Sequence, residues 1–310
     1  MYKNSQISRL SRRRFVATSV GVAAGLIGSG RLNAQTGSSA TDGNHLAVGK
    51  GIFKSVKWGM IQVPGSVREK FDLMKTLGYD GMELVSPIGL DAAEVRAASE
   101  ATGMPVHGVV DTKHWKIRLS DPDPKIREQG RGFLEQSLRE SEAFGGNAVL
   151  LVPGKVTGDD ETHDDVWSRS IAEIRKVLPL ASRLGVRVLI ENVWNGFCET
   201  PEQFRDYLDE MDSPWVGAYF DIGNVRKFSP SEDWIRTLGS HIVKVDVKDW
   251  GVKNGFCKIG DGDVNWLAVR KALHEIGFTG WSTAEVSGGD RERLADIFAR
   301  MNRVLGATAK

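Results

Sequence analysis

Four acidic residues in the C-terminal half of the chain each close a short run of β-branched, small or aromatic residues. They are Glu191, Asp221, Asp246 and Glu285, which follow residues 186–190, 216–220, 242–245 and 280–284. Such runs are typical of buried parallel strands, and a helical stretch separates each from the next. Because the strands of a (β/α) barrel end at one rim, the four carboxylates should converge there. They would repel one another without a cation between them, so the pattern predicts a metal site.

Eight strand-then-helix units over residues 51–310 predict the α/β class and a single (β/α)8 TIM barrel. The expected strands are 57–61, 81–85, 105–110, 147–152, 186–191, 216–221, 242–246 and 280–285. The expected helices are 67–77, 91–102, 124–144, 164–184, 201–211, 231–238, 265–276 and 290–305. Glycines at 78, 185 and 277 mark left-handed helix ends. The alternative, a doubly wound open sheet, lacks a Gly-x-Gly-x-x-Gly motif after its first strand.

The first 34 residues have the three parts of an export signal. Arg12 and Arg13 form a twin-arginine pattern, an apolar stretch covers residues 15–27, and residues 32–34 resemble a small-residue cleavage site. We therefore expect residues 1–34 to be a twin-arginine signal peptide, residues 35–50 to be a flexible linker, and the protein to be periplasmic or otherwise exported. The apolar stretch is too short and too rich in glycine to remain as a stable membrane anchor.

Removal of the signal changes the charge balance. Residues 1–34 contain six of the 41 Lys and Arg and none of the 40 Asp and Glu, so the remaining chain has a formal net charge of −5. A mildly acidic chain without a basic tract is not expected to bind nucleic acid. The two cysteines, Cys198 and Cys257, are expected to be separate thiols, and the oligomeric state stays open, a homo-oligomer included.

Four segments resemble the xylose-isomerase-like barrels over roughly residues 55–305. They are Gly-Tyr-Asp-Gly-Met-Glu-Leu at 78–84, Ile-Glu-Asn at 190–192, Phe-Asp-Ile-Gly-Asn at 220–224 and Val-Asp-Val-Lys-Asp at 245–249. That superfamily includes sugar isomerases and epimerases, hydroxypyruvate isomerase and endonuclease IV. In its epimerase branch a Glu, an Asp, a His and a Glu after strands five to eight hold one divalent metal. The resemblance therefore implies metal binding by Glu191, Asp221, Asp246 and Glu285, with the two glutamates as the catalytic acid–base pair.

Asp246 departs from this pattern, because the epimerases have His at this place. An all-oxygen ligand set favours Mn²⁺ or Mg²⁺, and also accommodates Ca²⁺, whereas imidazole draws Zn²⁺ or Co²⁺ more strongly. Four ionised carboxylates around one dication leave an excess of negative charge. We expect one carboxylate to be protonated, or to lie outside the metal's ligand set, or Lys248 or another cation to compensate.

The chemistry expected of this site begins with loss of a proton beside a sugar carbonyl, which forms an enediolate. Return of the proton on the opposite face gives an epimerase, and its transfer between carbons gives an isomerase. If the same carbanion expels its β-oxygen, a metal-dependent lyase or hydratase acting on keto-glycosides results. The substrate is expected to be an unphosphorylated sugar or keto-sugar, because the 260–263 loop is too acidic to cradle a phosphate.

Further side chains are expected to contact the sugar. His107 and Glu83 are placed at the ends of strands three and two, although a structural histidine or a paired carboxylate would fit equally well. Asn224 and Lys248 follow strands six and seven. The tryptophans after strands three, five and seven are expected to wall the sugar or to pack in the core: Trp115, Trp194 and Trp250.

Two other functional classes are weighed. A nuclease of the endonuclease IV kind would need a His-rich three-metal cluster and a basic groove, which the sequence does not offer. A non-catalytic sugar-binding protein would keep the tryptophans but would not need Glu191 and Glu285 on either side of a metal.

Overall fold

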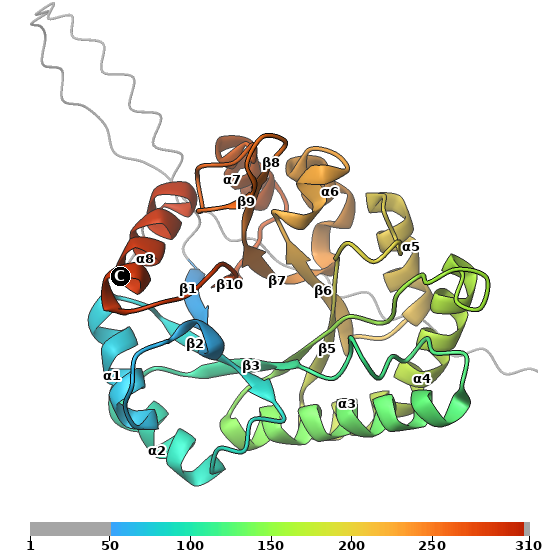
Figure 1. Ribbon diagram of the computed structural model, residues 1–310, viewed down its shortest axis with the longest axis horizontal. Coiled ribbons are helices and arrows are strands. Elements are labelled where there is room, and N and C mark those ends of the chain that lie inside the picture. Colours follow the sequence, from blue (N-terminus) through green and yellow to red (C-terminus); the bar gives the residue numbers. More distant parts are fainter. Residues whose placement is uncertain (1–50, 307–310) are drawn as a thin grey trace, which may run out of the picture. The chain divides into compact units, whose positions relative to one another are not determined.

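A computed structural model describes residues 51–306, which form a closed parallel barrel surrounded by helices (Figure 1). The barrel order is β1-β2-β3-β4-β5-β6-β7-β10, closed by pairing of β10 with β1. Its strands are β1 Ile52–Lys57, β2 Gly81–Ser86, β3 Val106–Asp111, β4 Ala148–Leu151, β5 Arg187–Glu191, β6 Val216–Asp221, β7 Ile242–Val247 and β10 Gly280–Ala284. The predicted single (β/α)8 barrel is confirmed. The predicted signal peptide and linker lie outside the described residues.

One α-helix follows each barrel strand along the chain. The α-helices are α1 Val67–Leu77, α2 Ala92–Thr102, α3 Pro124–Phe144, α4 His163–Leu184, α5 Pro201–Met211, α6 Ser231–Leu238, α7 Trp266–Glu275 and α8 Arg291–Leu305. Short 3₁₀ helices are η1 Trp58–Met60, η2 Asn224–Lys227 and η3 Gly239–His241. The apolar faces of the helices pack on the outside of the sheet and bury a continuous core between the two layers.

The helix ends follow local sequence signals. Ser66 and Glu69 form a capping box at the start of α1, and Gly78 ends this helix with a left-handed φ of 100°. Asp91 caps α2 by accepting a hydrogen bond from the amide of Ala93. The expected bounds of α1, α3, α5 and α6 agree with the structure.

The first strand differs from the prediction. It is Ile52–Lys57 rather than 57–61, and residues 58–60 form η1. The strand pairs with β10 from Ile52 opposite Gly280 to Val56 opposite Ala284. Lys54 and Ser55 are buried, and these polar residues obscure the apolar pattern of the strand. The shift matters because it places Lys57 at the carboxyl end of β1.

A two-stranded antiparallel hairpin interrupts the expected alternation after β7. It consists of β8 Asp249–Gly251 and β9 Gly255–Cys257, with Trp250 opposite Phe256. Its turn contains Asn254 followed by Gly255, which has a φ of 63°. The hairpin stands at the same end of the barrel as the four predicted carboxylates, since it begins two residues after β7 ends.

Two other expectations concern cysteines and membrane anchoring. Cys198 and Cys257 are unpaired, as expected. Between residues 51 and 306 no helix combines the length and apolar character required to cross a bilayer.

Candidate metal and sugar site

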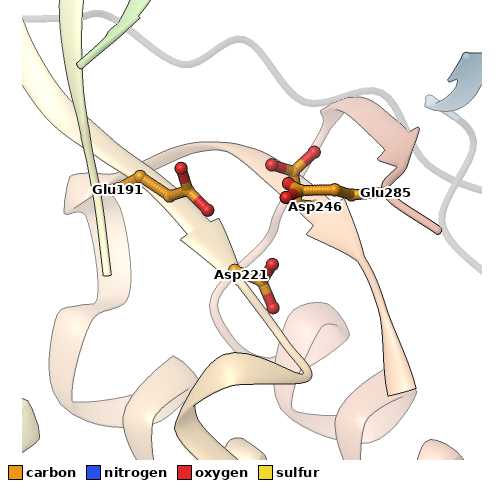
Figure 2. Close-up of side chains that lie close together, drawn as sticks. All are labelled: Glu191, Asp221, Asp246 and Glu285. Carbon is orange, nitrogen blue, oxygen red and sulfur yellow. The ribbon is translucent and has the colours of Figure 1, made fainter. Parts of the chain in front are cut away.

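The four predicted carboxylates converge at the carboxyl end of the barrel (Figure 2). Glu191 and Asp221 are the last residues of β5 and β6, Asp246 is the next-to-last residue of β7, and Glu285 directly follows β10. One oxygen from each lies within 4.8 Å of those of the other three. The carboxyl groups of Glu191 and Glu285 lie on opposite sides of the space between them (Figure 2).

Lys57 extends from the end of β1 into this cluster. Its Nζ lies 2.9 Å from Asp246 and 2.7 Å from Glu285, and 3.7 Å from Glu83. The side chain of Asp246 is fully buried, so its charge cannot be solvated by water. Lys57 therefore supplies positive charge where desolvation of carboxylates would otherwise be most costly.

Lys248 supplies a second positive charge, as one of the sequence-based alternatives expected. Its Nζ lies 3.0 Å from Asp221 and 2.9 Å from Glu285, and it donates to Oδ1 of Asn224 over 3.3 Å. Glu285 thus accepts from both lysines, whereas Glu191 pairs with neither within hydrogen-bonding distance in the described part of the chain.

These contacts separate the pKa values of the carboxylates. Burial raises the pKa of Glu191 well above its usual range, and the negative charge of Glu285 raises it further. Burial likewise raises the pKa of Asp246. For Glu285 burial also opposes ionisation, but Lys57 and Lys248 outweigh it and lower the pKa well below the usual range. In the protein without a cation, Glu285 is therefore the most readily ionised of these three.

The cluster has the donor atoms that a hard dication requires. Oδ1 of Asp246 is buried and accepts no hydrogen bond from the described residues, and Oδ2 of Asp221 is buried with the Nζ of Lys248 3.0 Å away. The backbone amide of Asn224 donates to the other oxygen of Asp221 over 2.7 Å, which orients Oδ2. All four candidate ligands are carboxylates, so these residues fit Mn²⁺, Mg²⁺ or Ca²⁺ better than Zn²⁺.

Four of the predicted sugar-contacting side chains line a pocket of about 220 Å³ above the cluster, together with Glu191 and Glu285. They are Trp115, Trp194, Asn224 and Lys248. Lys248 lines the same pocket, so it faces both the carboxylates and the space where a sugar would bind. Trp250 packs edge-on against Trp194, with ring centroids 5.9 Å apart, and supports that side chain.

His107 does not end its strand, and that prediction is wrong. It is the second residue of β3, and its buried ring lies inside the barrel, below the carboxylates. Nε2 is hydrogen-bonded to Ser55 over 2.8 Å, while Nδ1 lies 3.0 Å from Nζ of Lys244. The ring also stacks on Trp281 at 4.6 Å. His107 is the structural histidine that the sequence left as the alternative.

Glu83 is likewise not at a strand end. It is the third residue of β2 and is fully buried, and its partner among the cations of the site is Lys57, at 3.7 Å. Burial raises its pKa. It therefore contributes to the charge balance beneath the rim, which is the second of the two roles that its position suggested.

A layer of polar side chains supports the site from below. Ser55, Tyr219 and Thr283 each precede a residue of the site by two positions, namely Lys57, Asp221 and Glu285. Successive side chains of a strand alternate between faces, so residues two apart share a face. The hydroxyl of Thr283 is hydrogen-bonded to Ser55 over 2.8 Å and to Tyr219 over 2.7 Å. This layer ties together the strands that carry the site.

Sequence reasoning missed two residues of the site, Lys57 and Phe256. The sequence places Lys57 at the start of the expected strand 57–61, whereas in the structure it is the last residue of β1. Phe256 lies on the unexpected hairpin, where it lines the pocket and stacks on Trp194 at 4.7 Å. The Asn254-Gly255 dipeptide is a strong hairpin signal and would have located this element.

Comparison with known proteins gives a family match and several relatives. Residues 71–303 match the model of the xylose isomerase-like TIM barrel. L-ribulose-5-phosphate 3-epimerase UlaE of Salmonella paratyphi A is 26% identical over 257 residues, which cover 75% of this chain and 89% of that protein. The UlaE protein of Salmonella typhimurium matches with the same identity and coverage.

Solved structures show the same fold. The 3-keto-D-glucoside 4-epimerase YcjR of E. coli superposes with a TM-score of 0.71 at 17% identity, covering 83% of this chain and all of that one. A D-psicose 3-epimerase superposes with a TM-score of 0.70 at 17% identity and the same coverage.

We predict that Lys57→Met destabilises the metal-free protein by about 3–5 kcal/mol at pH 8, because the substitution leaves buried carboxylates without the positive charge of Lys57. The loss should be smaller at pH 3, below the unfolded-state pKa of a glutamate, which is about 4.5. Lys57 lowers the folded-state pKa of Glu285, so its stabilising effect is present above the unfolded pKa and fades as the pH falls. Urea denaturation in the presence of a chelator measures both values.

Lys253→Met is the matched control, since Lys253 is exposed on the hairpin turn. Equal stabilities of the two variants at pH 8 would show that Lys57 does not neutralise the cluster.

Proposed function

Because this chain belongs to the xylose isomerase-like TIM-barrel family, we propose that it is a divalent-metal-dependent epimerase or isomerase of an unphosphorylated sugar or keto-sugar. The resemblance inferred from the sequence motifs is confirmed, and so is the expected enzyme class, that of the sugar isomerases and epimerases. The observation that carries the proposal is the convergence of four carboxylates, with Glu191 and Glu285 on opposite sides of the gap between them.

Glu191, Asp221, Asp246 and Glu285 would hold the metal through carboxylate oxygens. When bound, a dication supplies Lewis-acid polarisation of a substrate carbonyl and stabilises negative charge on its oxygen. Its charge would add to those of Lys57 and Lys248 and so offset the carboxylates of the cluster, including Glu83. Mn²⁺ or Mg²⁺ is the cation we propose, since oxygen ligands suit both.

Proton transfer is assigned to Glu191 and Glu285. With the sugar between them, one carboxylate removes the proton from the carbon next to the carbonyl, and the other returns a proton to the opposite face. Lys248 contacts Glu285 and lines the pocket, so it orients this glutamate relative to the sugar. Trp115 and Trp194 line the pocket and would contact the apolar side of a pyranose or furanose ring.

The proposed substrate lacks a phosphate group, unlike the one named for UlaE. In the 260–263 loop, the amide of Gly260 already donates to Asp249 over 2.7 Å. Asp261 and Asp263 add negative charge to the same loop, although Arg300 pairs with Asp261. A loop with a committed amide and two carboxylates is poorly suited to bind a dianion.

A lyase that acts on keto-glycosides is the second candidate. It would use the same proton abstraction, after which the carbon–oxygen bond at the β position breaks and the departing oxygen leaves with the electron pair and takes up a proton. A further pocket on the other side of Glu285 supports this alternative, because it offers room for a leaving group.

The function is tested by incubating the Mn²⁺-loaded protein with unphosphorylated ketoses and 3-keto-glycosides in D₂O. We expect an epimer or isomer to form with deuterium from solvent at the reacting carbon. Glu191→Gln and Glu285→Gln should each lower kcat by roughly 10²–10⁴, the usual contribution of a general acid or base. An unsaturated product would identify the lyase instead.

Glu275→Gln is the matched control, because Glu275 is half exposed and pairs with Arg236 on the outer helices. Full turnover by both site variants would refute the acid–base assignment. A higher kcat/KM for the phosphorylated form of the same sugar would refute the proposed substrate class.

Asp246 distinguishes this site from a His-containing one. If Asp246 binds the metal, Asp246→Asn should weaken Mn²⁺ binding without abolishing it, because an oxygen donor remains while one negative charge is lost. Asp246→His should shift selectivity toward Zn²⁺ or Co²⁺. Calorimetric metal titrations measure both effects, with Asp261→Asn, an exposed carboxylate, as the control. Wild-type affinity in Asp246→Ala would mean that Asp246 serves only Lys57.

Export through the twin-arginine route to the periplasm is also proposed, on the sequence of residues 1–34. Changing Arg12 and Arg13 to Lys should retain the uncut protein in the cytoplasm. Cell fractionation with detection of the N-terminus measures this, and undiminished delivery of the double variant would contradict the proposal.

A further inference from the structure

Two pockets adjoin at the mouth of the barrel. The carboxylate pocket is the one of about 220 Å³ that contains Trp115, Trp194 and Glu191. The hairpin pocket, of about 380 Å³, lies between the β8–β9 hairpin and the segment that leads into α8. Lys248, Phe256 and Glu285 line both pockets, so the two spaces meet across these three side chains.

The boundary between the pockets carries an exposed aromatic platform. Phe256 is 50% exposed and Trp194 is 37% exposed, yet their rings stack at 4.7 Å with an interplanar angle of 28°. Lys248 lies over the Phe256 ring at 5.2 Å. Because both side chains stay partly exposed at the mouth, they are available to pack against a ligand.

The hairpin pocket has a mixed lining, in which Phe256, Cys257 and Val286 supply apolar surface beside the charged and polar side chains. Lys258, Ser287 and Arg293 line it, and Arg293 pairs with Asp296 over 2.8 Å and donates to the carbonyl of Ser287 over 3.1 Å. The charge of Lys248 is already shared by Asp221 and Glu285. Such a lining offers hydrogen-bond donors to hydroxyl groups and apolar surface to the face of a sugar ring.

The two carboxylates assigned to proton transfer are placed differently relative to these pockets. Glu191 is 8% exposed and lines the carboxylate pocket, whereas Glu285, with 30% of its side chain exposed, stands at the boundary. A carbon that reacts between them lies at the end of the carboxylate pocket nearest to the boundary. A substituent on the neighbouring atoms of the sugar would then project past Glu285 into the hairpin pocket.

From this arrangement we infer that the substrate is a glycoside with two polar ring units. The reacting sugar occupies the carboxylate pocket, and the second unit occupies the hairpin pocket against Phe256. This inference rests on the proposed function, because it uses Glu191 and Glu285 to locate the reacting carbon. It assigns the hairpin pocket a role in selecting glycosides over free monosaccharides.

Binding and turnover of matched substrates test the inference. The probes form two pairs. The first pair is 3-keto-glucose and a disaccharide of 3-keto-glucose with glucose, and the second pair is a ketohexose and a disaccharide that ends in the same ketohexose. We measure KM from turnover and the dissociation constant from tryptophan fluorescence, both with the Mn²⁺-loaded protein. We expect both values to be about tenfold lower for each disaccharide than for the corresponding monosaccharide. Ser287→Trp, which fills the hairpin pocket, should remove most of this advantage.

Val252→Trp is the matched control, because Val252 is 80% exposed at the hairpin turn and outside the lining of both pockets. It should keep the wild-type ratio between disaccharide and monosaccharide. The inference would be overturned if the monosaccharide and the disaccharide of each pair had equal KM values and dissociation constants. It would also be overturned if the advantage of the disaccharide persisted in Ser287→Trp. In either case, turnover of a monosaccharide would leave the proposed function standing. Absence of both binding and turnover for all four probes would refute the two together.

Discussion

The desolvation of carboxylates at the end of the barrel is the constraint on which the rest of the site depends. Asp221 and Asp246 are fully buried, and Glu83 lies just below them. Such a cluster is stable only if positive charge is fixed beside it, since water cannot solvate it. Lys57 at the end of β1 and Lys248 directly after β7 meet this need, and both contact Glu285. The charge balance therefore restricts which side chains can occupy the ends of the five neighbouring strands β6, β7, β10, β1 and β2.

The polar layer below the rim is a consequence of the same constraint. A barrel filled with aliphatic side chains would leave the inward ends of Lys57 and Glu83 without polar surroundings. Here Ser55, Tyr219 and Thr283 form a hydrogen-bonded layer one step down the strands from the site. Because a strand repeats every two residues, fixing this layer also fixes the rotation of the side chains above it. The interior thus contributes to preorganisation as well as to stability.

Much of this arrangement could be predicted from the sequence, for physical reasons. The strand-end acids follow apolar runs, and helix caps such as Asp91 mark the element boundaries, so the barrel and the four converging carboxylates were identified correctly. The errors fall where interior positions are polar. Lys54 and Ser55 concealed β1 and hence Lys57, and His107 and Glu83 were displaced to strand ends. Periodicity identifies apolar faces, but it cannot show that a barrel interior holds ion pairs.

The hairpin after β7 is the part of the mouth to which we attribute the proposed selectivity. Strand ends must hold the carboxylates within 4.8 Å of one another, so they tolerate little change. The β8–β9 segment only has to remain attached at Asp249, whose side chain accepts hydrogen bonds from Gly260 and Trp266. Between these anchor points, the residue at position 256 can change the lining of the pocket without moving an oxygen of the carboxylate cluster. In the proposed function, the carboxylates and the hairpin therefore have separate tasks in separate parts of the chain, and the two parts meet at Lys248, which precedes the hairpin and contacts Glu285.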